Sequence, residues 1–215
     1  MHFDIEQLRA GLERLAHPDG DLSPKKEATR RRILAAATEV LTERGFRRTS
    51  MEAVAERAGV SRGTLYTHAK SKEDVVIQAL AREQLGQLEA WAEILEPKRE
   101  PKERLRLLIT HSIGCFETSP VLALLVRGDA ELVRSLEQRP EVLEAFGGFD
   151  DDQLWEGALG EAFAGSDSEV IRKRAAVLRV LGAVGPALGD WAPAYGLSTS
   201  ELAQSLAQML VDGMG

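Results

Sequence analysis

The stretch Ala55-Glu56-Arg57-Ala58-Gly59-Val60-Ser61 decides the fold of the N-terminal part of this 215-residue chain. Ala55 is small enough to let two helices cross closely, and Gly59 tolerates the backbone conformation of a tight turn. Val60 can anchor that turn in a core, and Ser61 is a favoured N-cap for the next helix. The stretch therefore predicts two short helices joined by a turn that contains glycine, which is a helix-turn-helix unit.

Helical patterns continue on both sides of this turn. Apolar side chains three or four positions apart predict a first helix over residues 28–44, which Gly45 can end. Thr49 and Ser50 are candidate N-caps for the second helix. Ser71 can cap a long fourth helix, whose first turn carries acidic residues that suit the helix dipole.

The remainder of the chain also reads as helical. Helix-like stretches alternate with breakers over residues 102–117, 120–139, 141–147, 152–164, 167–190 and 198–213. Pro186 should kink or interrupt one of them. No alternating pattern of a strand is present, and an aromatic content of only 5% is unfavourable for sheets. We therefore expect an all-α protein.

The chemistry of the composition excludes several classes of protein. A single cysteine, Cys115, cannot form an intramolecular disulfide, and no Cys/His cluster has the spacing of a metal site. The N-terminus does not resemble a signal peptide, and no apolar run is long enough to span a bilayer. We expect a cytoplasmic protein with no metal, no cofactor and no membrane partner.

Charge is distributed unevenly along the chain. Residues 1–23, 24–82 and 83–215 carry net charges of −3, +6 and −10, which sum to the total of −7. A polyanion would be attracted to the middle segment and repelled by the rest. The helix-turn-helix lies within the positive segment, which indicates a nucleic-acid partner.

Over residues 28–74 the sequence resembles the N-terminal domain of the TetR family of bacterial regulators. The matching fragments are Gly45-Phe46, Thr49-Ser50, Val54-Ala55, Ala58-Gly59-Val60-Ser61, Gly63-Thr64-Leu65-Tyr66, His68 and Ser71-Lys72-Glu73. Ala69 departs from the pattern, because the family commonly has an aromatic residue there; this predicts looser packing under the third helix. The resemblance covers the first domain only.

The resemblance implies a fold and a mode of action. It implies an N-terminal three-helix helix-turn-helix DNA-binding domain plus a C-terminal helical ligand-binding and dimerisation domain. We expect these over residues 24–72 and 73–215, after an N-terminal extension (1–23) whose apolar residues three or four apart predict a short amphipathic helix. The resemblance also implies a homodimer that binds a palindromic operator in double-stranded DNA, most simply as a repressor, and that an unknown small-molecule effector releases. An activator or a non-transcriptional DNA-binding protein of the same fold is the alternative.

The resemblance also assigns DNA contacts to individual residues. Arg62, Gly63, Thr64 and Thr67 would lie nearest the base edges, where the Arg62 fork suits guanine and a Thr methyl suits thymine. Phosphate contacts are expected from Tyr66, His68, Thr49, Ser50 and Lys72, with further contacts from Lys25, Lys26, Arg30 and Arg31 in a flexible lead-in. Tyr66 and His68 can also be interpreted as polar-edged core residues, and the Arg30–Arg32 run as a solvated helix face.

In the body, one set of residues could line an apolar pocket between helices, which is the usual place for a ligand in a helical domain. The set is His111, Cys115, Phe116, Trp155 and Phe163. Core filling is the competing interpretation of these residues. The stretches 167–190 and 198–213 would form the dimer interface by analogy with the family.

An enzyme is the main rival class. The chain has no Gly-x-Ser-x-Gly elbow, no phosphate-binding Gly-x4-Gly-Lys loop and no His-Glu-x-x-His zinc site. The run Asp150–Asp152 lacks the alternating ligands of a calcium loop, so a solvated turn is favoured. We therefore expect no enzymatic activity.

Overall fold

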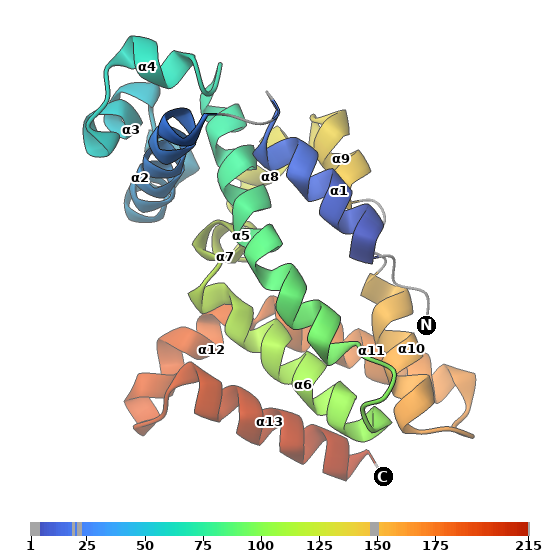
Figure 1. The fold of residues 1–215 in the computed structure, drawn as a ribbon. Coiled ribbons are helices and arrows are strands. Elements are labelled where there is room, and N and C mark those ends of the chain that lie inside the picture. Colours follow the sequence, from blue (N-terminus) through green and yellow to red (C-terminus); the bar gives the residue numbers. More distant parts are fainter. Residues whose placement is uncertain (1–4, 19, 21–22, 147–150, 215) are drawn as a thin grey trace. The chain divides into compact units, whose positions relative to one another are not determined.

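The computed structural model describes residues 5–18, 20, 23–146 and 151–214. Every regular element in these ranges is helical, which confirms the all-α prediction. Of the run Asp150–Asp152, for which a solvated turn is expected, Asp150 lies outside the described ranges and the other two residues begin a helix. By packing, the chain divides into two units (Figure 1): an N-terminal unit of Glu6–Gly86 with Ser119–Gly148, and a C-terminal unit of Met1–Ile5, Gln87–Thr118 and Phe149–Gly215.

The N-terminal unit contains the helix-turn-helix and the helices that support it. Its elements are α1 (Ile5–Ala16), α2 (Pro24–Arg48), α3 (Met51–Ala58), α4 (Arg62–Tyr66), the first part of α5 (Lys72–Ile94), α7 (Pro120–Val126), α8 (Ala130–Glu137) and α9 (Pro140–Phe146). Helix α2 begins earlier than residue 28, because Pro24 occupies its first turn, where proline is favoured. Its regular backbone is interrupted at Gly45 (φ 73°, ψ 165°), where the sequence predicts the end of the first helix.

The expected single helix over 120–139 is two helices in the structure, α7 and α8. Asp129 explains the break, because its Oδ1 accepts from the Leu132 backbone N–H at 3.0 Å and so caps α8. Its Oδ2 accepts from the Phe46 backbone N–H at 3.2 Å, at the end of α2. The sequence prediction overlooked this cap, and a single aspartate thereby starts one helix and secures another.

The C-terminal unit is built from the end of α5 and seven further elements among the described residues. These are α6 (Pro101–Gly114), η1 (Cys115–Glu117), α10 (Asp151–Ala162), α11 (Ser168–Ala183), α12 (Gly185–Trp191), η2 (Ala192–Tyr195) and α13 (Thr199–Gly213). Helix α13 runs alongside α6 (Figure 1). The stretch 167–190 is interrupted at Val184, just before Pro186, as predicted.

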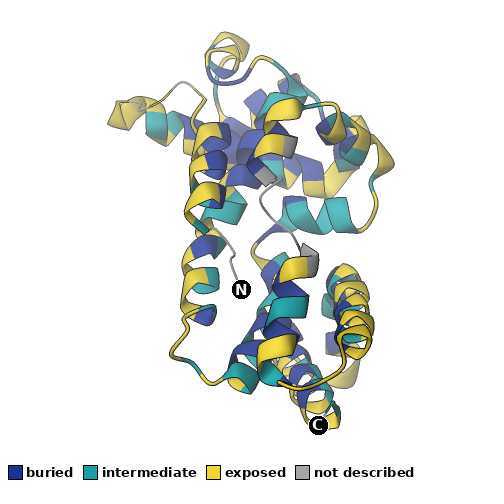
Figure 2. Ribbon diagram, turned by 90° about the vertical axis from the view of Figure 1, so that its right-hand side faces the viewer, coloured by how far each residue is buried: buried dark blue, intermediate teal, exposed yellow. Residues whose placement is uncertain are grey.

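Each unit has its own apolar core, because every long helix buries one face and exposes the other (Figure 2). In the N-terminal unit, Leu12, Val40 and Leu65 are fully buried. In the C-terminal unit, Leu105 and Leu108 of α6 pack with Leu159 and with residues of α11 and α13. Burying a leucine side chain completely, rather than leaving it exposed to water, stabilises the folded state by roughly 1.5 to 3 kcal/mol.

The packing units and the predicted domains divide the chain by different criteria. Helices α7, α8 and α9 pack in the same unit as the helix-turn-helix. The division of the sequence after residues 23 and 72 stays a prediction.

Within the described ranges, no single helix is long and apolar enough to cross a membrane; the bent pair Pro101–Glu117 and Pro120–Val126 meets that criterion only when taken together.

Candidate nucleic-acid interface

The turn between α3 and α4 has the geometry that its sequence predicts. Gly59 has left-handed backbone angles (φ 62°, ψ 40°), which a residue with a Cβ rarely adopts. Its N–H donates to the Glu56 carbonyl at 3.1 Å, and the Val60 N–H donates to the Ala55 carbonyl at 3.0 Å. These bonds form the glycine-terminated end of a helix and fix the direction in which the chain enters α4.

Two arginines hold α3 against α2. Arg32 on α2 donates through Nη2 to the carbonyls of Ala58 (2.7 Å) and Gly59 (3.0 Å), which have no partner within α3. From the other direction, Arg57 on α3 forms ion pairs with Glu43 (2.8 Å) and Glu39 (2.9 Å) of α2. Hydrogen bonds to Glu43, and then to Glu39, raise the pKa of Arg57.

Helix α4 is short, and two residues orient it. The Ser61 hydroxyl accepts from the Thr64 backbone N–H at 3.0 Å, as predicted for an N-cap. The Leu65 side chain is fully buried, so the opposite face of α4 must face outward. At the end of the helix, the Thr67 hydroxyl donates to the Thr64 carbonyl at 2.7 Å.

The outward face of α4 carries the residues expected at the bases. Arg62 is mostly exposed and pairs with Glu52 of α3. Gly63 is exposed, and the nearest atom to a Cβ placed there is the Ser61 Oγ at 3.8 Å, so the surface is open. Thr64 is half-buried beside them, and Thr67, which caps the end of the helix, is exposed. The structure brings this group together on one helix.

The residues expected to contact phosphates differ in their burial and in their hydrogen-bond partners. Thr49 is buried, and its hydroxyl donates to the Gly45 carbonyl at 2.9 Å. The Lys72 Nζ donates to the Phe46 carbonyl at 3.0 Å and lies 4.0 Å from the centre of the Phe46 ring. Both side chains therefore hold the end of α2 in place.

Two further members of that set also have structural roles. Ser50 caps α3 by accepting from the Ala53 N–H at 3.2 Å. His68 is buried, with only 8% of its surface exposed. The interpretation of His68 as a polar-edged core residue therefore agrees with its burial, whereas Tyr66 remains available on the surface.

The basic lead-in was expected to be flexible, but in the structure it forms the first turns of α2. One of its arginines is also buried. Arg30 is fully buried and donates to the Ala16 carbonyl at the end of α1 (3.3 Å), so its predicted phosphate contact is wrong. Lys25 and Lys26 are exposed on the first turn of α2.

Sequence reasoning assigned no role to Arg47 and Arg48, which are exposed just before α3. Lys70, which follows α4, is exposed as well. All three contribute to the net charge of +6 of residues 24–82, so the count contained the signal although it named no residue.

The five residues proposed for a body pocket all lie in the C-terminal unit. Trp155 and Phe163 belong to its apolar core. His111 packs edge-on against Trp91, with ring centres 4.8 Å apart, and burial lowers its pKa. Cys115 is buried beside Ser112, and Phe116 packs against Gly185.

Comparisons with known proteins agree with this geometry. Residues 33–79 match the family model described as bacterial regulatory proteins, tetR family. The chain is 30% identical over 188 residues to the fatty acid metabolism regulator protein of Bacillus subtilis strain 168, covering 85% of this chain and 93% of that protein. The chain belongs to the TetR family.

Further relatives of this TetR-family chain are also regulators. The transcriptional repressor KstR of Rhodococcus jostii RHA1 is 35% identical over 105 residues, which cover 48% of this chain and 49% of that protein. The crystal structure of the regulator FadR from Bacillus subtilis in complex with stearoyl-CoA has a TM-score of 0.60 at 24% identity, covering 85% of this chain and 98% of that chain, which shows the common fold. The protein is a DNA-binding transcriptional regulator.

Proposed function

We propose that this regulator binds a palindromic operator as a homodimer, represses transcription there in the cytoplasm, and is released by a small molecule. The observation that carries the proposal is the group formed by the exposed Arg62 and Gly63 with the half-buried Thr64, held on α4 by the Ser61 cap and the buried Leu65. A helix presented in this way can enter the major groove with its first residues at the bases.

The proposed contacts fall into two groups. Arg62, Gly63, Thr64 and Thr67 read base edges, where bidentate and close contacts discriminate between sequences. Phosphate contacts come from the exposed cations of the N-terminal unit and from hydroxyl or N–H groups near α3, which position the protein without reading sequence. The residues are Ser50, Tyr66, Lys25, Lys26, Arg47 and Arg48, with Thr49, His68 and Lys72 acting through the backbone that they hold.

The dimer would form through the last helices of the C-terminal unit. Large apolar side chains are exposed there, in a protein whose other apolar side chains are mostly buried: Val170, Val177, Val180, Val184, Trp191, Tyr195, Leu197 and Met209. Val180 is 65% exposed and Met209 is 72% exposed, which suits surfaces that a second copy covers. A two-fold dimer places one α4 on each half of a palindrome.

The effector would bind the C-terminal unit. His111, Cys115, Phe116, Trp155 and Phe163 remain the proposed lining, and the His111 Nε2 is buried with no hydrogen-bond partner among the described residues. A long-chain acyl-CoA is the first compound to test, because one relative is named a fatty acid metabolism regulator and another structure holds stearoyl-CoA. Its binding would have to favour a conformation with lower DNA affinity.

Selection of bound sequences from random double-stranded DNA tests the proposal. An inverted repeat should emerge, and its affinity should fall steeply with salt as phosphate-bound counterions are released. Stearoyl-CoA is then added to the complex, with stearate and free coenzyme A as controls. Absence of salt-sensitive DNA binding would refute the interface, whereas DNA binding that stearoyl-CoA does not weaken would refute only this class of effector.

A further inference from the structure

Arg62 is the side chain of α4 with the most hydrogen-bond donors to offer DNA. The Thr64 hydroxyl already shares a hydrogen bond with the Ser61 Oγ at 2.8 Å, and the Thr67 hydroxyl donates to the Thr64 carbonyl at 2.7 Å. Gly63 has no side chain. The Arg62 guanidinium carries five N–H donors in a rigid fork, and its side chain is mostly exposed. Whatever fixes the direction of this side chain therefore influences how well α4 discriminates between base pairs.

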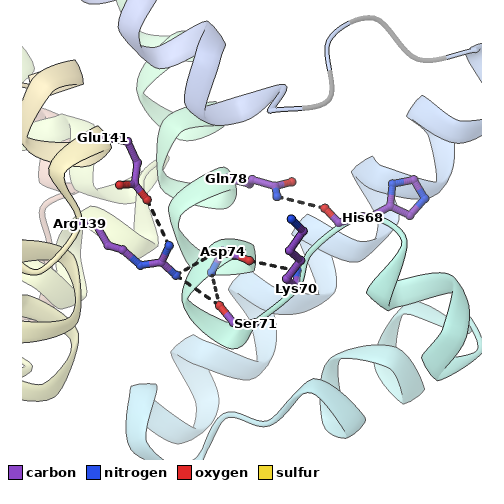
Figure 3. A network of polar contacts seen from close by, with 7 residues as sticks. All are labelled: His68, Lys70, Ser71, Asp74, Gln78, Arg139 and Glu141. Atoms are coloured by element: carbon purple, nitrogen blue, oxygen red, sulfur yellow. Dashed lines mark hydrogen bonds and ion pairs between the residues drawn. The ribbon is translucent and has the colours of Figure 1, made fainter.

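The backbone of α4 is held at both ends. Before it, the Gly59 turn fixes the direction in which the chain enters the helix. After it, the His68 carbonyl accepts from the Gln78 Nε2 at 3.1 Å, and the Lys70 backbone N–H donates to the Asp74 carboxylate at 3.0 Å (Figure 3). The side chains of α4, rather than its backbone, are thus the parts that can adjust to DNA.

A carboxylate of the preceding helix contacts the Arg62 guanidinium. Glu52 lies in the first turn of α3, and its Oε1 accepts from the Arg62 Nη2. Its neighbours Met51 and Val54 are buried, which anchors the helix that carries Glu52. The ion pair joins the two helices of the motif, and the side chains remain 65% exposed at Arg62 and 51% exposed at Glu52. Both groups are therefore within reach of a DNA molecule bound against α4.

The contact with Glu52 leaves the guanidinium able to read a base. It occupies one N–H of the Arg62 Nη2, and the fork has further N–H groups on Nη1, Nη2 and Nε. A bidentate contact with the O6 and N7 of guanine needs two neighbouring N–H groups. The same guanidinium can therefore contact Glu52 and a guanine at once.

A phosphate is the competing partner for an exposed arginine beside DNA. Such a contact raises the affinity for every sequence and adds nothing to base preference. The Glu52 carboxylate opposes it in two ways, because a guanidinium that turns to a phosphate loses its ion pair and because the carboxylate itself repels phosphates. An exposed ion pair is weak, so its effect is a bias in the direction of the side chain.

We propose that Glu52 is a positioning residue for sequence recognition, which holds the Arg62 guanidinium toward the bases and away from the phosphates. Glu52 thereby lowers the affinity for every DNA sequence and raises the ratio between affinity for the operator and affinity for other DNA. The inference rests on the proposed function, in which Arg62 reads a base pair.

Two substitutions separate the charge of Glu52 from its contact. Glu52→Gln removes the charge and keeps the length of the side chain. Glu52→Asp keeps the charge and draws the carboxylate back by one methylene group. Glu56→Gln is the matched control, because Glu56 is exposed on the same helix and its replacement removes the same charge. Each change is also made in the Arg62→Ala background.

Dissociation constants are measured for the selected operator and for operators with each base pair replaced in turn, all at one salt concentration. Glu52→Gln should tighten binding to every sequence and lower the discrimination at the base pair that Arg62 reads by about twofold to fivefold, the range of an exposed ion pair. Glu52→Asp should lower this discrimination and tighten binding less. Glu56→Gln should tighten binding to all sequences equally, and Glu52→Gln should leave base preference unchanged once Arg62 is alanine.

Four results would overturn the proposal. Unchanged discrimination in both Glu52 variants would refute it and leave Arg62 as a base reader. An equal loss of discrimination in Glu56→Gln would reduce the effect to net charge. A change in preference that persists in the Arg62→Ala background would show that Glu52 does not act through Arg62. If Arg62→Ala itself leaves base preference unchanged, the proposed role of α4 in base recognition fails together with this inference.

Discussion

The Arg32 Nη2 lies 2.7 Å from the Ala58 carbonyl oxygen, so a side chain of α2 satisfies the end of α3 immediately before the Gly59 turn. The same nitrogen is 3.0 Å from the Gly59 carbonyl. The direction of α4 thus depends on a residue outside the two helices of the motif.

Replacement of Arg32 by methionine should lower the free energy of unfolding by about 1 to 3 kcal/mol, because it removes a charged donor from two carbonyls and keeps an apolar stem. DNA affinity should fall as well, since α4 loses its fixed direction. Urea denaturation and DNA titration measure the two effects. Arg31→Met is the control, because Arg31 is exposed and its ion pair, with Glu27 at 3.3 Å, lies within its own helix. Equal losses in the two variants would contradict this role for Arg32.

Arg62→Ala should relax base preference by about 1 to 3 kcal/mol at the position that Arg62 reads, whereas Lys25→Ala should weaken binding to all sequences and reduce the salt dependence. In the free protein Arg62 pairs with Glu52, which competes with DNA for the guanidinium. Glu52→Gln should therefore tighten DNA binding. Competition titrations with the selected operator and with mismatched DNA measure these effects, and identical changes in base preference for Arg62→Ala and Lys25→Ala would refute the division of roles.

Lys72→Ala should weaken binding to all sequences and also lower stability, because the Lys72 ammonium contacts both the carbonyl and the ring of Phe46. Urea denaturation separates this residue from Lys25, whose loss should leave the unfolding free energy nearly unchanged. A fully stable Lys72→Ala variant would show that the Phe46 contacts contribute little.

Glu83 should make the stability of the N-terminal unit depend on pH. Burial raises its pKa to about 7, and the N–H groups of Val121 and Leu122, which favour the carboxylate, offset part of that rise. The folded state therefore holds a proton more tightly than the unfolded chain, whose glutamate ionises near 4.5. The contribution is fully present below that value and is lost as pH rises through about 7.

Denaturation of the wild type and of Glu83→Gln between pH 4 and pH 8 measures this contribution. The stability difference between the two proteins should shift in favour of the glutamine variant as pH rises, and should become constant above the folded-state pKa. A difference that does not vary with pH would show that Glu83 ionises normally.

The homodimer should dissociate when charge is placed on its proposed surface. Val180→Glu and Met209→Glu add carboxylates to exposed apolar positions on α11 and α13, and burying them against a second copy would be costly. Sedimentation equilibrium should show a large increase in the monomer fraction at micromolar concentrations. Gln204→Glu, an exposed polar position on α13, is the control. A wild-type chain that is monomeric at these concentrations would refute the dimer.

Cys115 should react slowly with iodoacetamide in the folded protein. Burial raises the pKa of its thiol to about 11, so little thiolate exists near neutral pH. Mass spectrometry should show alkylation many times slower in native protein than in urea. If stearoyl-CoA binds beside this residue, alkylation should slow further; rapid native alkylation would place Cys115 at the surface.

Local sequence determined the helix-turn-helix itself. Ser50, Gly59 and Ser61 act on neighbouring backbone groups, so their caps and turn follow from residue type and short-range spacing. Residue type and short-range spacing also predicted the break before Pro186 and the position of Arg62 at the start of α4, and the charge count identified the basic segment.

Only the tertiary structure decided which polar side chains are committed to distant partners. Arg30 reaches the end of α1, Lys72 reaches Phe46, and Asp129 reaches back to the end of α2, and none of these contacts leaves a periodic signal. The buried Gln78 oxygen, to which no described group donates, is likewise invisible in the sequence, because its burial results from packing between helices. Contacts between residues far apart in the chain depend on how helices pack, and residue type alone does not encode that packing.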